Sequence, residues 1–100
     1  MAARQVVRGT CFDLHFCPAT TASRARIGLI VPKRLARAAA LRNAIKRQAR
    51  EAFRRVASAI PACDLVLRLK RPMPGVNARD SAQRKIWRAE METLLRHFLT

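Results

Sequence analysis

The sequence predicts a small α+β fold, in which one four-stranded sheet packs against two helices. Three observations predict it. Residues 10–17 alternate between apolar and polar side chains, as a half-buried strand does. Residues 38–58 repeat apolar side chains at steps of three and four, as an amphipathic helix does. Apolar runs at 26–31 and 64–69 flank that helix, and strands joined through a long helix are expected to be parallel neighbours in an otherwise mostly antiparallel sheet.

The first quarter of the chain predicts two strands joined by a turn. Residues 1–8 favour a short edge strand, and Gly9 allows the chain to turn. In the strand at 10–17, successive side chains point to opposite faces of the sheet. Its apolar face holds Phe12, Leu14 and Phe16, and its open face holds Cys11, Asp13, His15 and Cys17. Residues 18–23 are expected to form a loop.

The remaining elements follow from local patterns. Residues 26–31 form a nearly continuous apolar run, which predicts a central strand that ends at Pro32. Residues 64–69 predict a further strand, and prolines and a glycine make 70–76 a loop. The last helix is expected to be capped by Asn77 or Asp80 and to run to about His97, and Asp80 with Gln83 resembles a capping box. Its buried stripe is expected to comprise Ile86, Trp87, Met91, Leu94, Leu95 and Phe98.

The helix at 38–58 separates apolar from charged side chains. Residues 32–55 contain nine Lys or Arg residues and one acid, Glu51. At about 100° per residue, one face of this helix holds Leu41, Ile45, Ala49, Ala52 and Val56. The opposite side holds Asn43, Arg47, Arg50 and Arg54, with Lys46 beside them. The apolar stripe must pack on the sheet, so the cationic side is left to meet a polyanion.

Composition narrows the class of partner. The 100 residues suit a single domain, and the formal net charge of +15 favours a negatively charged partner. Nucleic acid is the first candidate. An anionic membrane is the second, but the chain has neither a run of about eighteen apolar residues nor a signal-peptide pattern, so we expect no membrane partner. The three cysteines show no metal-binding spacing, which favours a reducing, cytoplasmic location.

The central run resembles the protein subunit of bacterial ribonuclease P. The residues that carry the resemblance are the strand Ile27-Gly28-Leu29-Ile30-Val31, then Lys33, Arg34 and Arg37, then the run from Arg42-Asn43-Ala44-Ile45-Lys46-Arg47 through Arg50-Glu51-Ala52-Phe53-Arg54. Ala44 stands where the family has the second arginine of its Arg-Asn-Arg motif. The family's N-terminal helix has no counterpart before the first strand, so either the sequence begins downstream of it or this member lacks it.

The resemblance implies both a fold and a function. The implied strand–helix–strand crossover is left-handed, whereas the general rule would predict a right-handed one. The implied protein is a monomer within the complex. It binds the catalytic RNA and the 5′ leader of precursor transfer RNA, and it assists endonucleolytic removal of that leader. The RNA with magnesium performs the cleavage, so the protein is expected to bind no cofactor alone and to have no catalytic residues. Among six acids and two histidines, the sequence shows no catalytic or metal-binding constellation.

The expected contacts divide into two surfaces. The residues expected to bind RNA are Lys33, Arg34, Arg37, Arg42, Asn43, Lys46, Arg47, Arg50 and Arg54. The cations would neutralise phosphates, and the Asn43 amide could bond a 2′-hydroxyl or a base edge. By resemblance, the open face of the strand at 10–17 faces the leader, through Cys11, Asp13 and His15. His15 could stack on a base, whereas Phe12, Phe16, Trp87 and Phe98 are expected in the core.

Two other functions fit parts of the sequence. A ribosomal-protein-like structural RNA-binding protein would be equally basic, but it would not stimulate the processing of precursor transfer RNA. A stand-alone nuclease would need acids or histidines that converge on one site. Only Asp13, His15 and Glu51 offer themselves for that role, and they are scattered along the chain.

Overall fold

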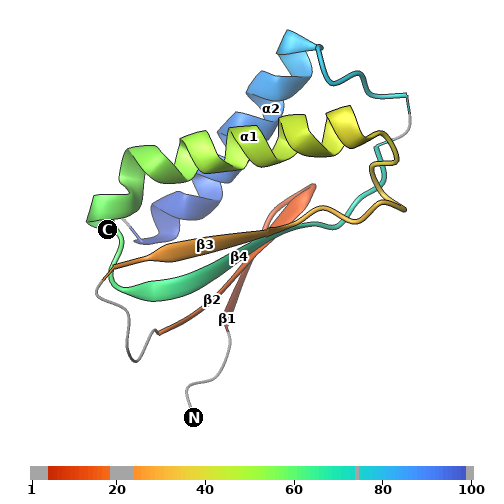
Figure 1. The fold of residues 1–100 in the computed structure, drawn as a ribbon. Helices are drawn as coiled ribbons and strands as arrows, with labels where there is room; N and C mark the ends of the chain where they lie inside the picture. Colours follow the sequence, from red (N-terminus) through yellow and green to blue (C-terminus); the bar gives the residue numbers. More distant parts are fainter. Residues whose placement is uncertain (1–4, 19–23, 74, 99–100) are drawn as a thin grey trace.

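A computed structural model describes residues 5–18, 24–73 and 75–98. These residues form four strands and two helices, whose arrangement Figure 1 shows. The elements in chain order are β1 (Gln5–Arg8), β2 (Phe12–Pro18), β3 (Arg26–Ile30), α1 (Ala39–Val56), β4 (Cys63–Leu69) and α2 (Ser81–Leu95). A short 3₁₀ turn follows each helix, at Ala57–Ala59 and Arg96–Phe98. The predicted α+β class and element order are confirmed.

The four strands form one mixed sheet in the order β1-β2-β4-β3. β2 is antiparallel to both of its neighbours, and β3 and β4 are parallel, as expected for strands joined through α1. The prediction that 26–31 is a central strand is wrong, because β3 pairs only with β4 and lies at an edge. Its side chains alternate between half-buried and exposed, with Ile30 45% exposed. The hand of the crossover stays a prediction of the resemblance.

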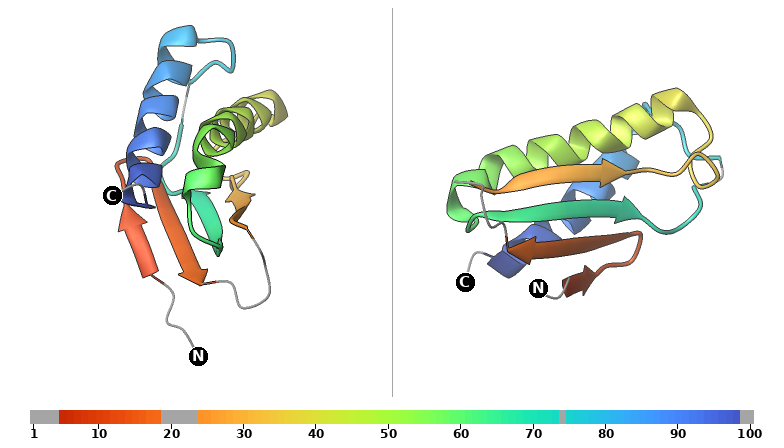
Figure 2. Two further views of the ribbon diagram at one scale, coloured as in Figure 1. Left: turned by 90° about the vertical axis from the view of Figure 1, so that its left-hand side faces the viewer. Right: turned by 60° about the horizontal axis from the view of Figure 1, so that its bottom comes forward.

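Both helices cover the same face of the sheet, and no other described element covers the opposite face (Figures 1 and 2). The helix-facing side chains of β2 and β4 form the floor of one hydrophobic core, and the apolar faces of α1 and α2 pack on it. Phe12, Leu14 and Trp87 are at most 1% exposed. Burying one such large apolar side chain stabilises the fold by about 1.5–3 kcal/mol.

α1 has the charge-segregated character that its periodicity predicts. Leu41, Ile45, Ala49 and Ala52 are all buried against the sheet or α2, and Val56 is half-buried. The helix begins without a side-chain cap at Ala38. Tertiary packing of the apolar stripe, rather than capping, is therefore what stabilises this helix.

α2 begins at the predicted cap. The Asp80 carboxylate accepts a hydrogen bond from the Gln83 backbone N–H at 3.1 Å, while the Asp80 N–H donates to the Asn77 carbonyl. Trp87, Met91, Leu94 and Leu95 are buried as predicted. Ile86 is 57% exposed, so its place in the predicted stripe is wrong. Around the helix Ile86 lies about 140° from Met91, which turns it toward solvent.

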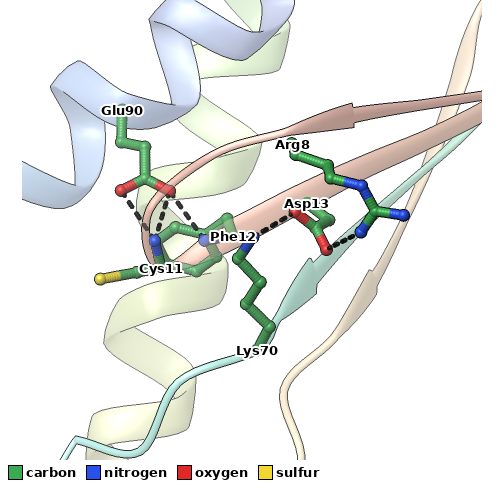
Figure 3. A network of polar contacts seen from close by, with 6 residues as sticks. All are labelled: Arg8, Cys11, Phe12, Asp13, Lys70 and Glu90. Carbon is green, nitrogen blue, oxygen red and sulfur yellow. Dashed lines mark hydrogen bonds and ion pairs between the residues drawn. The ribbon is translucent and has the colours of Figure 1, made fainter.

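The strand predicted at 10–17 is shifted along the chain. β2 begins at Phe12 and includes Pro18, so Cys11 belongs to the turn before the strand. Glu90 of α2 holds this turn: its carboxylate accepts hydrogen bonds from the backbone N–H groups of Cys11 at 2.9 Å and Phe12 at 2.7 Å. The C-terminal helix thereby fixes where β1 ends and β2 begins (Figure 3).

Candidate nucleic-acid interface

The outer side of α1 carries the cations that the sequence places there. Arg47, Arg50 and Arg54 are exposed beside Asn43, and Lys46 is half-buried. The Arg54 guanidinium forms an ion pair with the Glu51 carboxylate at 2.7 Å, which neutralises part of its charge. Among the described residues, Lys46, Arg47 and Arg50 form no such pair. These three side chains are therefore the strongest phosphate-binding candidates on α1.

A second group of cations lies on the turn between β3 and α1, where Lys33, Arg34 and Arg37 are all exposed. Their backbone is nevertheless fixed, because Leu35 and Ala36 are buried in the core and their N–H groups donate to the Pro32 carbonyl. The Leu35 carbonyl also accepts a hydrogen bond from the Met73 N–H at 2.8 Å. Buried residues between the cations thus anchor the turn and leave the charges at its surface.

Arg42 has a different setting from the other cations. It is half-buried, and its Nη1 donates to the Ala36 carbonyl at 3.1 Å and to the Arg37 carbonyl at 2.7 Å. This guanidinium closes the turn against the first turn of α1, a role that its spacing in the sequence did not indicate. One of its nitrogen atoms is therefore already occupied when a phosphate approaches.

On the face of the sheet that the helices leave uncovered, which we call the open sheet face, residues paired across neighbouring strands form rows. The central row places His15 between Val6 and Val66, with Gly28 beyond Val66. His15 is half-buried, and its Nδ1 has no hydrogen-bond partner in the described part of the chain. Neighbouring rows add Arg8 and Arg68 on one side and Arg26 on the other. A small apolar strip edged by arginines results, and a base could lie on it.

Asp13 is not an open group on this face, so the expectation that it lines an accessible surface is wrong. It is 7% exposed, and its carboxylate pairs with the Lys70 ammonium at 2.8 Å and the Arg8 guanidinium at 3.7 Å (Figure 3). Burial alone would raise the pKa of this carboxyl, but Lys70 and Arg8 outweigh burial and lower its pKa below the ordinary value. Cys11 likewise lies outside the strand, so of the three residues predicted to face the leader only His15 lies at the open face of β2 with a partly exposed side chain.

Two features were not found among the described residues. No group of three or more His, Cys, Asp or Glu side chains within 5–18, 24–73 and 75–98 is placed to hold a metal ion. In the same part of the chain, no helix is both long and apolar enough to cross a membrane. The described chain is thus a small α+β domain in which a cationic helix face and turn accompany an open sheet face that carries arginines.

The chain belongs to the ribonuclease P family, since the family model described as Ribonuclease P matches residues 1–98. It is 46% identical over 72 residues to the ribonuclease P protein component of Azoarcus sp. (strain BH72), an alignment that covers 72% of this chain and 59% of the relative. The corresponding protein of Bordetella petrii is 37% identical over 97 residues, covering 92% of this chain and 76% of the relative. The first of these relatives is thus matched over less than two thirds of its length.

The fold matches solved structures of the same family. The RNase P protein of Staphylococcus aureus superposes with a TM-score of 0.69 at 27% sequence identity, over 96% of this chain and 78% of that protein. At that coverage the match includes the four strands and both helices. It therefore includes the elements that carry the cationic turn and the outer face of α1.

Proposed function

We propose that this chain is the protein subunit of ribonuclease P, which removes the 5′ leader of precursor transfer RNA. The subunit binds the catalytic RNA through the turn at 33–37 and the outer face of α1. The catalytic RNA with magnesium performs the phosphodiester cleavage. The protein raises affinity for the substrate and stabilises the folded RNA, which are roles that require charge and shape rather than catalytic side chains.

The observation that carries this proposal is the segregation of charge on α1 in a chain of this family. Its apolar stripe is buried, while Lys46, Arg47 and Arg50 remain unpaired among the described residues. Each phosphate contact made by such a cation releases condensed counterions. The affinity for RNA should therefore fall with salt, with a log–log slope of about −0.7 to −0.9 per contact.

The open sheet face is the surface that we assign to the leader. It lies on the opposite side of the sheet from α1, so one domain could hold the catalytic RNA and the leader at the same time (Figure 2). A single-stranded leader presents unstacked bases, which proteins recognise by stacking and by contacts to base edges. His15 is the ring on this face, and Arg68 beside it forms no ion pair among the described residues. Arg8 and Arg26 add less charge for the leader phosphates, because they pair with Asp13 and Asp64.

The test is reconstitution with a bacterial ribonuclease P RNA and a precursor transfer RNA. Adding the protein should lower the magnesium concentration needed for half-maximal cleavage. His15→Ala should weaken binding of precursor transfer RNA to the reconstituted enzyme, with no effect on mature transfer RNA, which lacks the leader. Arg47→Ala should weaken binding of the catalytic RNA itself.

Two results would count against the proposal. If the magnesium requirement does not change while the protein binds ribosomal RNA tightly, the chain is a structural RNA-binding protein instead. If His15→Ala weakens precursor and mature transfer RNA equally, the sheet face does not contact the leader.

A further inference from the structure

We propose that the trough between α1 and α2 is a second RNA-binding site, which takes one ribose–phosphate backbone. The trough is formed by two adjoining hollows of about 570 Å³ and 350 Å³ that share Gln48 of α1 and Arg84 of α2 among their lining residues. We name the combined feature the α1–α2 trough. The proposal rests on the function proposed above, but none of its α2 residues belongs to the surfaces assigned there.

The trough is strongly cationic. Its positively charged lining residues are Arg47 of α1, Arg84, Lys85 and Arg88 of α2, and Arg96 just beyond α2. Glu92 is the one carboxylate that lines the same two hollows, and none of these six side chains takes part in an ion pair within the described residues. Charges of one sign along a cleft with protein walls concentrate an anionic ligand there.

Two guanidinium groups in the trough each have one nitrogen, Nε, without an acceptor among the described residues. The Nε atoms of Arg84 and Arg88 are shielded from solvent, and neither has a hydrogen-bond partner in the described structure. The Arg84 side chain makes one long contact, from Nη2 to the Arg79 carbonyl at 3.4 Å. A buried donor without an acceptor is unfavourable, and charged phosphate oxygens are the acceptors that guanidinium groups bind best. Because both arginines also line the trough, a phosphodiester bound there would bring charged acceptors to these two side chains.

The remaining lining residues favour RNA over a protein partner. The uncharged side chains are alanines or small polar groups, among them Asn43, Gln48 and Ser81. A peptide helix would need a large apolar pocket, whereas amide and hydroxyl groups can bond the 2′-hydroxyls of RNA. Asn43 and Arg47 belong both to the trough and to the outer face of α1, so an RNA bound on α1 can continue into the trough.

Ala44 and Arg84 line the same, smaller hollow of the trough. At this position α1 has only a methyl group, and α2 provides a cation to the same hollow. An arginine introduced at position 44 would occupy the same space. This arrangement makes a rescue experiment possible.

The experiment measures binding of an in vitro transcribed ribonuclease P RNA, without precursor transfer RNA, over a range of salt concentrations. Arg84→Gln and Arg88→Gln keep part of the aliphatic stem but remove the charge. Each should raise Kd by about threefold to tenfold and make the log–log salt slope shallower by about 0.7–0.9. Arg71→Gln is the matched control, because it removes an equal charge from an exposed loop outside both surfaces. It should change Kd less than either trough variant.

Rescue separates a binding role from a structural one. Adding Ala44→Arg to Arg84→Gln should restore most of the lost affinity and the salt slope, and both proteins should melt at the wild-type temperature. If Arg84→Gln and Arg88→Gln behave like Arg71→Gln while Arg50→Ala, which lies on the outer face of α1 and lines neither hollow, still weakens binding, the trough is not a site and the proposed function stands. If Arg50→Ala also has no effect, both proposals fail. Loss of affinity together with a lower melting temperature and no rescue would assign Arg84 a structural role and overturn the inference.

Discussion

Replacing Glu90 by Ala should destabilise the whole domain, although Glu90 lies on a helix and is only half-buried. Its two carboxylate oxygens accept hydrogen bonds from the Cys11 N–H at 3.1 and 2.9 Å, and one of them also accepts from the Phe12 N–H at 2.7 Å (Figure 3). These contacts join residues about eighty positions apart in the chain. They fix the turn from β1 to β2 against α2, and so they fix the edge of the open sheet face.

The magnitude follows from the number and type of these bonds. A hydrogen bond to a charged group contributes about 1.5–3 kcal/mol, and two backbone donors lose their acceptor in Glu90→Ala. Because the site is half-buried, water can replace part of the loss, which leaves about 2–3 kcal/mol of destabilisation. For a domain of this size each kcal/mol shifts Tm by about 4–8 °C, so we expect Tm to fall by about 8–24 °C.

Thermal unfolding followed by circular dichroism measures this effect. Glu92→Ala is the control, since it removes the same charge from the same helix but breaks no side-chain hydrogen bond or ion pair of the described structure. Gly9→Ala should reproduce part of the effect, because a Cβ at Gly9 would lie 2.7 Å from Oε2 of Glu90 and from the Phe12 carbonyl oxygen. Equal Tm values for Glu90→Ala and Glu92→Ala would refute the reasoning.

Two further predictions concern single charges. Lys46→Ala and Arg47→Ala should each weaken RNA binding by about threefold to tenfold at unchanged Tm, because both leave the buried stripe of α1 intact. Filter binding measures the affinity and melting curves measure Tm. A large fall in Tm would contradict the prediction. Asp13→Asn should be less stable than the wild type at neutral pH. The folded-state pKa of Asp13 is lowered, so its ion pairs stabilise the fold above the unfolded pKa of about 4 and are lost as the pH falls through the folded value. Urea unfolding at a series of pH values should show the difference shrinking below about pH 4, and a difference that persists undiminished in acid would contradict the assignment.

Much of the fold could be predicted because it is encoded in local periodicity. Each of two patterns requires burial of one face of its element: the apolar stripe of α1 from Leu41 to Ala52, and the alternating Leu65, Leu67 and Leu69 of β4. The structure buries the apolar residues of both patterns. The outward direction of Arg47 and Arg50 follows from the same geometry. Local spacing is sufficient for these features because each depends on a single helix or strand.

Features that depend on distant parts of the chain could not be predicted in this way. The position of β3 at an edge results from the insertion of β4 beside β2, which no apolar run in β3 indicates. The burial of Asp13 depends on Lys70, which is brought to it by the loop after β4. The α1–α2 trough exists because two helices that β4 separates in the sequence pack together, and its arginines in α2 lie outside the basic run that dominates the sequence.

Arg42 and Arg47 show most clearly what spacing alone cannot distinguish, since both lie in one basic helix. The Arg42 guanidinium donates to the carbonyls of Ala36 and Arg37, whereas Arg47 is exposed and unpaired among the described residues. Arg42→Ala should therefore release the turn at 33–37 and cost about 1–2 kcal/mol of stability.

The two variants should separate when melting and binding are measured together. Arg42→Ala should lower Tm and leave the salt slope of RNA binding nearly unchanged, because the surface cations of the turn remain on the protein. Arg47→Ala should leave Tm unchanged and make the slope shallower by about 0.7–0.9. If Arg42→Ala instead made the slope shallower at an unchanged Tm, its guanidinium would be bound to a phosphate, and Arg42 would not anchor the turn.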